Sequence, residues 1–506
     1  MHSFVYGSVK NIDETFNKIW DIAVIGSGMG SLTAASLHEK DGKNIVVLEQ
    51  NYLPGGCVSS YYRKGYIFEA GATTLVGMDD NMPLKYLLEE LNISIDKVLL
   101  KTPMKVHFQD KMVATRHHSI DEWIEEAERI FGKKNQRLFW EYCFKVSNFV
   151  WETSLKQLSF PPTRFKDLIP ILKKFQFKQV QFATTAFTSM QLLLEKYDLL
   201  DNERFINFIN EQLLITAQNS IEEVNVLFGC TALCYTNFGN YYVNGGLINL
   251  VKPICEYINS QNGTVLTRVG VNSVELINGF YELKTNKKGE GKVIRAKRLI
   301  SGIPINNTLD LYSTKELNQK YKKSLMPSEK LVSAFGMGIG FKSDKKFDCI
   351  HHQIHLDEPL PYCNSKSIFV SLNHASDQSR TPSAAHQVAN ISTHVHDPKA
   401  NDEFDKEVVE NAIFDALEKH DFLKKEDIEY YHSYLPTSWE NWIGRKYGFV
   451  GGYPQYFKIK PWQMIDARLD GKNAYICGDT TYPGQGIPGA TLSGLIAYQK
   501  MKLDGV

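Results

Sequence analysis

The sequence predicts an α/β protein whose two ends fold together and whose middle forms a second domain. Residues 21–25 and 45–48 are apolar and flank a helix-forming run at 32–39, which is the strand, helix, strand order of a βαβ unit. Residues 465–503 contain an apolar strand that ends at Cys477, a loop rich in glycine and proline, and a helix from about Thr491. No low-complexity linker separates the parts of the chain, so we expect the domains to interleave.

The middle of the chain changes its pattern twice. Residues 81–240 are mostly helical, with amphipathic runs at 119–131 and 139–149, whereas 330–434 is rich in strand-like segments. Between them, a helical run at 245–259 leads into a strand at 265–276 and a hairpin at 280–300. We therefore assign 20–80, 241–310 and 465–503 to a discontinuous Rossmann-like domain, and 81–240 and 311–464 to an inserted α+β substrate domain.

The bulk composition excludes several classes of protein. Lys and Arg together equal Asp and Glu in number, so no overall positive field favours nucleic acid, and we expect no nucleic-acid partner. None of the eight cysteines is spaced C-x-x-C, which favours free thiols in a reducing compartment over disulfides or a zinc site. No stretch approaches the ~18 apolar residues of a spanning helix, and the amino-terminal residues lack the apolar core of a signal peptide. We expect a cytoplasmic protein.

A glycine turn, Gly26-Ser-Gly28-Met-Gly30-Ser31, follows the first strand and opens the helix. Missing side chains there let the backbone approach a pyrophosphate, and the helix N-terminus faces its negative charge. Glu49, followed by Gln50, ends the second strand about 20 residues further on, where a carboxylate can accept hydrogen bonds from ribose hydroxyls. A turn that only packs the helix on the strand is the alternative, and dinucleotide binding is favoured over it.

Two further features favour FAD over a nicotinamide cofactor. A second glycine pair stands in Pro54-Gly55-Gly56-Cys57, and its backbone could line the pyrophosphate. A plain tight turn is the alternative interpretation. Near the other end, Gly478-Asp479 puts a carboxylate at a strand end, where it could hold a ribityl hydroxyl, a group that FAD has and NAD lacks. The loop at 482–489 then turns into a helix whose positive end could face the flavin.

These motifs resemble the phytoene-desaturase type of FAD-dependent oxidoreductase, which includes carotenoid desaturases, carotenoid cis-trans isomerase and retinol saturase. The similarity runs from the first glycine turn to Gly494, and residues 70–77 and 448–455 are most similar to carotenoid C-3′,4′ desaturases. The loop Pro483-Gly-Gln-Gly-Ile-Pro488 is also similar to the isomerase. Family patterns commonly have Arg after the glycine pair and Asp after Phe68, and this chain has Cys57 and Glu69 there.

The resemblance implies a set of residues that touch FAD, with Val271 reaching the adenine through its backbone. The full set is Gly26, Gly28, Gly30, Ser31, Glu49, Gln50, Gly56, Cys57, Gly71, Ala72, Thr73, Val271, Gly478, Asp479, Gly486, Ile487 and Pro488. We assign no catalytic acid or base, because hydride loss from a polyene leaves a cation spread along the conjugated chain, and a weak base or water can then take the proton.

Two other features have two interpretations each. His351, His352 and His355 lie in a strand-like segment without a metal-binding pattern, so we expect ordinary surface or cleft histidines and no metal. Trp439 and Trp442 line the substrate cavity or belong to the core.

The segment 160–182 interleaves aromatic and aliphatic residues with basic ones, which are Arg164, Lys166, Lys173, Lys174 and Lys178. It is either a helical hairpin covering the substrate domain or, as we favour, an interfacial segment for peripheral contact with the inner face of a membrane. In a membrane-contact segment these basic side chains would meet anionic headgroups.

The expected function is oxidation, isomerisation or saturation of a hydrophobic conjugated polyene, with carotenoid desaturation first. Flavin amine oxidation is an alternative that would need a polar amine site. A prenyl-lipid escort protein is a non-enzyme alternative, which the intact Gly26, Glu49 and Asp479 disfavour because lipid carriage needs no ribityl contact. The sequence leaves the electron acceptor open.

Overall fold

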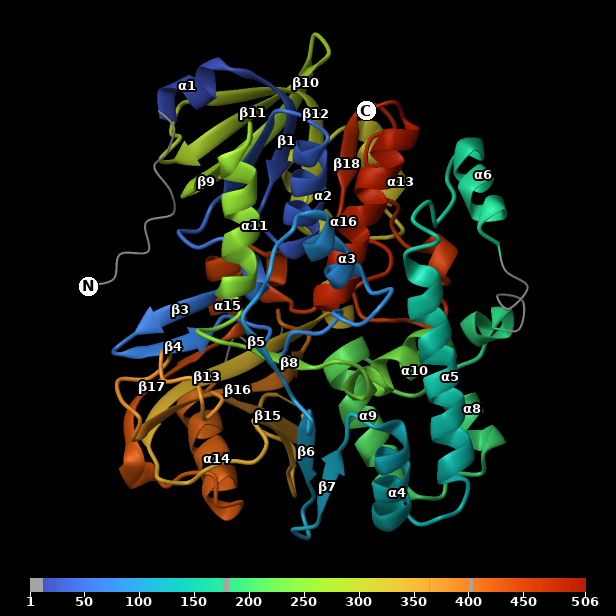
Figure 1. Cartoon of the computed structure of the whole chain (residues 1–506), viewed down its shortest axis with the longest axis vertical. Coiled ribbons are helices and arrows are strands. Elements are labelled where there is room, and N and C mark those ends of the chain that lie inside the picture. The colour runs from blue at the N-terminus through green and yellow to red at the C-terminus, as the bar shows by residue number, and fades with distance from the viewer. Residues whose placement is uncertain (1–11, 176–181, 364, 400–403) are drawn as a thin grey trace.

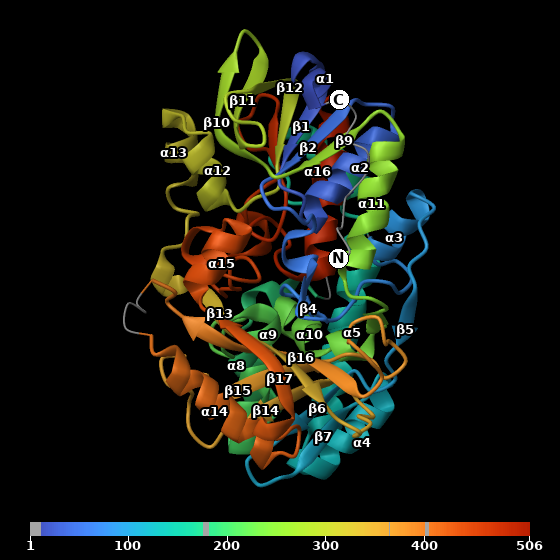
Figure 2. The same ribbon diagram turned by 90° about the vertical axis from the view of Figure 1, so that its left-hand side faces the viewer.

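The computed structural model describes residues 12–175, 182–363, 365–399 and 404–506. Two large sheets lie one above the other in Figure 1, with a group of helices beside the lower sheet. The amino-terminal strand and the carboxyl end of the chain both lie in the upper part, as the interleaved arrangement predicts. Figure 2 shows α15 (Pro436–Ile443) between the upper sheet and the lower one.

The first sheet has the strand order β10-β11-β12-β1-β2-β9, and β18 also pairs with β12. Its central strands are parallel, whereas β10, β11 and β12 form an antiparallel meander. The strands are β1 (Ile19–Ile25), β2 (Ile45–Glu49), β9 (Thr264–Thr267), β10 (Val269–Ile277), β11 (Phe280–Lys287), β12 (Val293–Ser301) and β18 (Ala474–Ile476). They come from three separate stretches of the chain, and the βαβ unit predicted at the amino-terminal end is confirmed.

Helices α2 (Met29–Lys40) and α16 (Gly486–Leu503) pack against each other beside this sheet. Gly494 permits the close approach, since a Cβ there would lie 2.4 Å from the Gly30 carbonyl oxygen. The prediction that the last helix starts near Thr491 was wrong, because the helix begins at Gly486 and accommodates Pro488 in its first turn, where a missing N–H breaks no hydrogen bond. Further helices of this part are α1 (Ile12–Asn17), α3 (Pro83–Glu90), α11 (Ile248–Ser260), α12 (Ile305–Leu311) and α13 (Lys315–Tyr321).

The second sheet has the order β17-β13-β16-β15-β14-β6-β7 and is antiparallel except where β6 meets β14. Its strands are β6 (Met104–His107), β7 (Val113–Arg116), β13 (Val332–Lys342), β14 (His351–His355), β15 (Ser367–Leu372), β16 (His386–His396) and β17 (Ile428–Tyr434). The helices of this part are α4 (Ile120–Phe131), α5 (Gln136–Ser154), α8 (Met190–Lys196), α9 (Glu203–Ala217), α10 (Val226–Leu233) and α14 (Lys406–Lys419). Helix α6 (Phe165–Lys173) follows α5 in the chain but lies beside the upper part, where it contacts α16. The β-rich pattern predicted for 330–434 is confirmed.

A buried ion pair holds a two-stranded hairpin against the second sheet. The hairpin of β3 (Ser60–Arg63) and β4 (Tyr66–Glu69) lies between the two large sheets, and the pair β5 (Lys97–Leu99) and β8 (Tyr241–Val243) lies nearby. Glu69 accepts a 2.6 Å hydrogen bond from the Ser60 hydroxyl and lies 3.1 Å from the Arg380 guanidinium, and both charged side chains are almost fully buried. The Glu69 N–H also donates to Asn390 on β16, so this corner fixes β4 against the second sheet.

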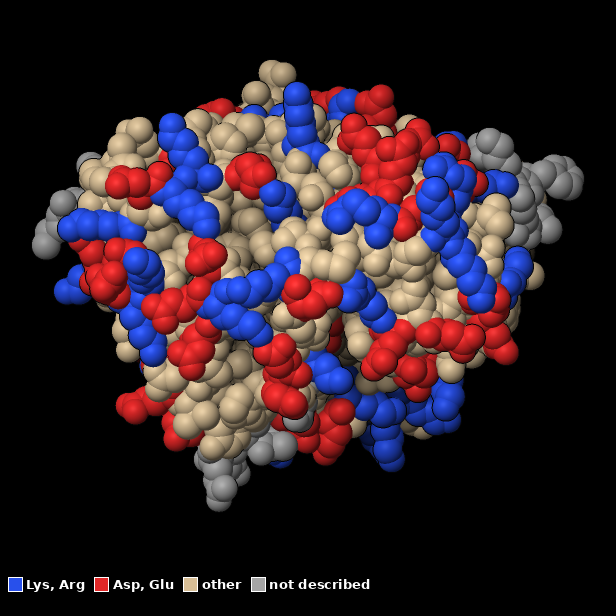
Figure 3. All heavy atoms as spheres, turned by 90° about the horizontal axis from the view of Figure 1, so that it is seen from below, with Lys and Arg blue, Asp and Glu red and all other residues tan. Residues whose placement is uncertain are grey.

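The surface carries charges of both signs, as the balanced composition predicts. Figure 3, which looks at the end of the molecule that carries the second sheet, shows basic and acidic side chains intermixed over the surface. Among the helices that the structure describes, none combines the length and apolar character needed to cross a bilayer.

Candidate cofactor site

The first glycine turn connects the end of β1 to the start of α2. Gly26 has a φ of +83°, and a Cβ there would lie 3.0 Å from Ile303. A Cβ on Gly30 would meet the Gly478 nitrogen at 3.0 Å and the Ala490 oxygen at 3.1 Å, whereas nothing lies within 4 Å of one on Gly28. Gly26 and Gly30 are therefore needed for packing, and Gly28 presents bare backbone to open space at a helix N-terminus.

The second glycine pair faces this turn. Gly55 and Gly56 both have positive φ, and the Gly55 N–H donates a 3.1 Å hydrogen bond to the Ser27 carbonyl. A Cβ on Gly56 would lie 3.9 Å from the Gly28 Cα. The two glycine turns therefore lie side by side, as a shared contact to one pyrophosphate would require.

Glu49 is fixed at the end of β2 by three hydrogen bonds. Its carboxylate accepts from the Ser27 N–H at 3.0 Å, the Ser27 hydroxyl at 2.6 Å and the Asn51 N–H at 2.8 Å. Burial raises the pKa of Glu49, although these donors favour the charged form. The neighbouring Gln50 packs its amide against Gly444.

Residues 71–73 lie beside Cys57, next to the second glycine pair. The Ala72 N–H donates to the Cys57 carbonyl at 2.9 Å, and a Cβ on Gly71 would lie 3.2 Å from the ring of Trp439. Trp439 is therefore buried beside the predicted site, which accommodates both interpretations of this residue. Thr73 contacts the His351 ring through its backbone.

Val271 lies half-buried on β10, where the ladder with β11 is irregular. The Arg268 N–H donates to the Asn51 carbonyl at 2.8 Å, which places the start of β10 beside the end of β2. The start of the strand predicted to reach the adenine therefore lies close to the end of β2, where Glu49 stands.

The carboxy-terminal residues close the site. Gly478 has a φ of +111° and its N–H donates to the Ser493 hydroxyl at 2.8 Å, so α16 and the end of β18 are held together. A Cβ on Gly77 would lie 2.9 Å from Pro488, which brings the 70–77 segment against the start of α16. Gly486 is exposed with a φ of +83°, whereas Ile487 is buried.

Asp479 has a partner that the sequence analysis missed. The Arg445 guanidinium donates to both of its carboxylate oxygens, with one contact at 2.8 Å, and lies 3.9 Å from the Cys57 sulfur. Arg445 lies 34 positions from Asp479 in the chain, and no local pattern links the two. The only signal available was the neighbouring glycine-rich run at 448–455.

Several buried polar atoms around these turns fit a bound dinucleotide. Within the described part of the chain, no hydrogen-bond partner is found for the Ser31 hydroxyl, the Trp439 indole N–H or the side-chain oxygens of Gln218 and Gln485. Such atoms are costly to bury without a partner, and a polar ligand would satisfy them. Together with the bare backbone at Gly28, the residues present fit FAD.

The three histidines of β14 are buried, so the expectation of surface positions was wrong, although His355 lines a small hollow together with Phe108 and Arg204. Burial lowers the pKa of His351 to about 4 and that of His352 to about 3, so both rings are neutral at pH 7. His351 lies 3.1 Å from the Thr74 hydroxyl, close to the 70–77 segment. Within the described ranges, no group of three or more His, Cys, Asp or Glu side chains is arranged to hold a metal ion.

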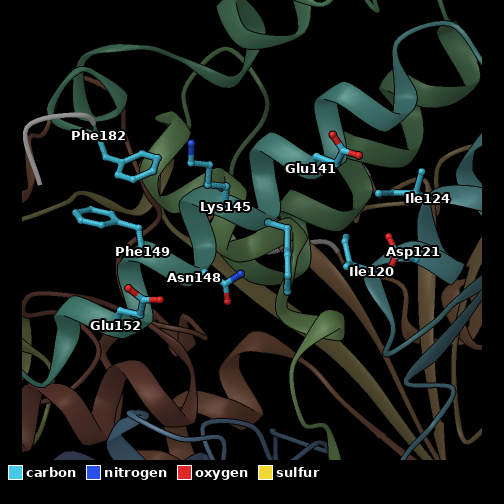
Figure 4. A pocket seen from close by; sticks show the side chains of 10 residues that line it. Ile120, Asp121, Ile124, Glu141, Lys145, Asn148, Phe149, Glu152 and Phe182 are labelled. Carbon is cyan, nitrogen blue, oxygen red and sulfur yellow. The ribbon is translucent and has the colours of Figure 1, made fainter. Parts of the chain in front are cut away.

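A separate surface groove lies on α4 and α5 (Figure 4). Its lining includes Ile120 and Ile124 of α4 and, on α5, charged side chains as well as Phe149, which stacks on Phe182 at 4.4 Å. None of the residues predicted to touch FAD lines this groove. The groove is therefore separate from the predicted cofactor site.

Comparison with known proteins supports the same assignment. The family of flavin containing amine oxidoreductases matches residues 32–501. Prolycopene isomerase from Daucus carota is 25% identical over 99% of this chain and 85% of its own length. All-trans-retinol 13,14-reductase from Danio rerio is 23% identical over 90% and 82%.

Solved structures show the same fold at low sequence identity. Cyclohexylamine oxidase from Brevibacterium oxydans has a TM-score of 0.60 at 12% identity, covering 96% of this chain and 99% of its own. A fatty acid isomerase from P. acnes has a TM-score of 0.57 at 12% identity, covering 95% and 98%. The chain therefore belongs to the flavin containing amine oxidoreductase family and is an FAD-dependent oxidoreductase of the phytoene-desaturase type that includes carotenoid isomerases and retinol reductases.

Proposed function

We propose that this protein uses FAD to convert a long conjugated polyene, with carotenoid desaturation as the first candidate reaction. In this proposal the residues at 20–80, 241–310 and 465–503 hold the cofactor through the set named from the sequence. The two glycine turns would line its pyrophosphate, Glu49 its ribose, and Asp479 its ribityl chain. FAD, when bound, supplies two-electron hydride chemistry.

The observation that carries the substrate class is the exposed apolar face of α6. Phe165 and Leu172 are 81% and 70% exposed, and Leu168 and Ile169 are also exposed. A helix that only covered the domain would turn these side chains inward, because burial of each large apolar side chain stabilises a protein by about 1.5–3 kcal/mol. An apolar helical face held at the surface fits contact with lipid.

The opposite side of α6 is anchored by charge. Asp167, fully buried, accepts two 2.7 Å hydrogen bonds from Arg468 and also caps the first turn of the helix through the Arg164 N–H. Asp504 pairs with Arg164 and Lys166. The helix is thus fixed with its apolar face outward.

This anchoring revises which basic residues could meet lipid headgroups. We expected Arg164 and Lys166 to do so, but both are turned toward Asp504. Lys173 and Lys174 are exposed beside the apolar face and remain available. Lys178, also expected at the membrane, lies outside the described residues.

The same segment touches the loop that precedes the predicted flavin-facing helix. The Phe160 ring packs 4.9 Å from the Tyr482 ring, and Lys500 of α16 donates to the Pro161 carbonyl at 2.6 Å. Passage of a hydrocarbon through water costs about 0.8 kcal/mol per CH₂. A polyene that moved directly from a bilayer at α6 would arrive beside this loop, so we include peripheral membrane contact in the proposal.

The residues of the site favour positioning over acid-base catalysis. Among the described side chains that we assign to the cofactor, the two carboxylates are already engaged, Glu49 by Ser27 and Asn51 and Asp479 by Arg445. A polyene needs alignment and exclusion of water more than it needs a strong base. This supports a hydrocarbon substrate over an amine, whose site would require a polar pocket.

Cis-trans isomerisation is the second candidate. It is supported by the similarity to prolycopene isomerase, which extends over 99% of this chain. Saturation of the polyene is the third candidate, and it is supported by the similarity to all-trans-retinol 13,14-reductase.

The test is anaerobic mixing of FAD-loaded enzyme with candidate carotenoids in liposomes, with flavin and carotenoid spectra recorded together. A desaturase bleaches the oxidised flavin as the polyene absorption shifts to longer wavelength. An isomerase changes polyene geometry without net electron transfer and is assayed after prior reduction of the enzyme, and a saturase shortens the conjugation and consumes reducing equivalents. Rapid bleaching by a biogenic amine, with no polyene reacting in either redox state, would overturn the proposal.

A further inference from the structure

Arg445 joins three segments that are distant in the chain. It follows α15 and lies against the Phe449 ring at 4.6 Å, with its Nη1 atom 3.9 Å from the Cys57 sulfur and 2.8 Å from Asp479. Phe449 is fully buried, and the Arg445 side chain is 8% exposed. The guanidinium is therefore held from several sides.

The exposed fractions of the two side chains show which partner of the ion pair lies nearer the surface. Asp479 is 22% exposed, whereas Arg445 is 8% exposed, so the carboxylate lies nearer the open side of the site and the guanidinium lies behind it. Each carboxylate oxygen can accept more than one hydrogen bond, and Arg445 donates one to each. Both oxygens therefore keep acceptor capacity toward the site.

We propose that Arg445 is a positioning residue for FAD, which fixes the Asp479 carboxylate in the orientation that accepts hydrogen bonds from the ribityl hydroxyls. The proposal rests on the assignment of Asp479 to FAD in the proposed function. A fork of two parallel N–H donors sets the plane of a carboxylate, which a single lysine ammonium cannot do. Arg445 thereby contributes to cofactor affinity through Asp479, without a contact of its own to FAD.

The test measures FAD affinity by titration of apoprotein for Arg445→Gln, Arg445→Lys, Asp479→Asn and the Arg445→Gln/Asp479→Asn double variant. Lys446→Gln is the matched control, because the adjacent Lys446 makes a surface ion pair with Asp310. We expect Arg445→Gln to weaken FAD binding about 10- to 100-fold, which corresponds to loss of one hydrogen bond to a charged group. Arg445→Lys should recover part of the affinity and Lys446→Gln should match the wild type.

The double variant separates positioning from a general structural effect. If Arg445 acts through Asp479, the double variant binds FAD no more weakly than Asp479→Asn alone. Apoprotein melting adds a second measurement, because Asp479→Asn leaves a buried cation without its partner and the second substitution should restore part of the lost stability.

The possible outcomes separate an error in the proposed cofactor site from an error in the role of Arg445. Unchanged FAD affinity in Asp479→Asn would overturn the proposed cofactor site itself. Weakened binding in Asp479→Asn with wild-type binding in Arg445→Gln would overturn only the role of Arg445. Additive losses in the double variant would also overturn it, because they would show that Arg445 acts independently of Asp479.

Discussion

Alanine substitutions at Gly28 and Gly30 should separate cofactor binding from folding. Both glycines belong to the first turn, two positions apart, yet an added Cβ meets nothing within 4 Å at Gly28 and meets backbone atoms at 3.0 and 3.1 Å at Gly30. The neighbours of Gly30 are the backbone of Gly478 and Ala490, which cannot rotate away as a side chain could.

The expected magnitudes follow from these distances. Gly30→Ala should destabilise the apoprotein by about 1–3 kcal/mol, the usual cost of overpacking. Gly28→Ala should change apoprotein stability by less than about 1 kcal/mol, because Gly28 has a φ of −67°, which alanine adopts easily. The lower preference for alanine at a helix N-cap opposes the gain from a stiffer unfolded chain.

The assay is thermal melting of both apoproteins together with FAD titration. Gly28→Ala should melt like the wild type and bind FAD at least about tenfold more weakly, a loss of about 1.4 kcal/mol, because its methyl group occupies the space at the helix N-terminus. Wild-type FAD affinity in a folded Gly28→Ala protein would show that the cofactor does not approach this turn. Wild-type stability in Gly30→Ala would refute the packing argument.

Three further predictions concern α6 and the buried ion pairs. Replacing Phe165 and Leu172 with Ser should weaken binding to anionic liposomes at least tenfold, because burying their 81% and 70% exposed side chains in lipid corresponds to about 2–4 kcal/mol. The control is Leu138→Ser on α5, where the side chain is 56% exposed and the substitution should not change liposome binding. Equal losses for both proteins in liposome sedimentation would contradict the role of α6. Burial alone would raise the pKa of Asp167, but hydrogen bonds from the guanidinium and backbone around it lower that pKa overall, so its contribution to stability is present above about pH 4 and is lost as the pH falls through the lowered value. The difference in melting temperature between wild type and Asp167→Asn should therefore be constant from pH 7 to about 4 and shrink below it, and a constant difference down to pH 2 would argue against this ion pair. Arg380→Gln leaves a buried carboxylate without its cation and should cost about 3–5 kcal/mol in urea unfolding, and a cost below about 1 kcal/mol, typical of surface pairs, would show that the hairpin of β3 and β4 is held by other contacts.

The parts of the fold that the sequence predicted are those with local signals. The strand, glycine turn and helix at 19–40 depend on apolar periodicity and on glycines that lie within a few positions of one another, and the structure has them as expected. The start of α16 was missed by five residues, because glycines and a proline usually mark a break, whereas here Pro488 lies in the first turn, where a proline is tolerated.

The contacts that the sequence could not predict join residues far apart in the chain. Arg164 and Lys166 have the spacing of a basic interfacial helix, but their direction is decided by Asp504, more than 330 positions away. Cys57 and Arg445 are separated by 388 positions, and only the folded chain brings the guanidinium beside the second glycine turn. Local patterns therefore predicted the backbone of the cofactor site, while its electrostatic support depended on tertiary structure.

The position of β18 has a consequence for biosynthesis. This strand, at 474–476, pairs with β12, which in turn pairs with β1, and Gly478 at its end meets the first glycine turn. A ribosome must therefore have reached residue 478 before the first sheet can close, so the early βαβ unit emerges with one side of its site missing. Contacts of such long sequence separation fold slowly and leave apolar surface exposed in the meantime. Yield of folded enzyme during expression should accordingly depend on chaperone capacity, and added FAD can stabilise only chains that already extend beyond Gly478.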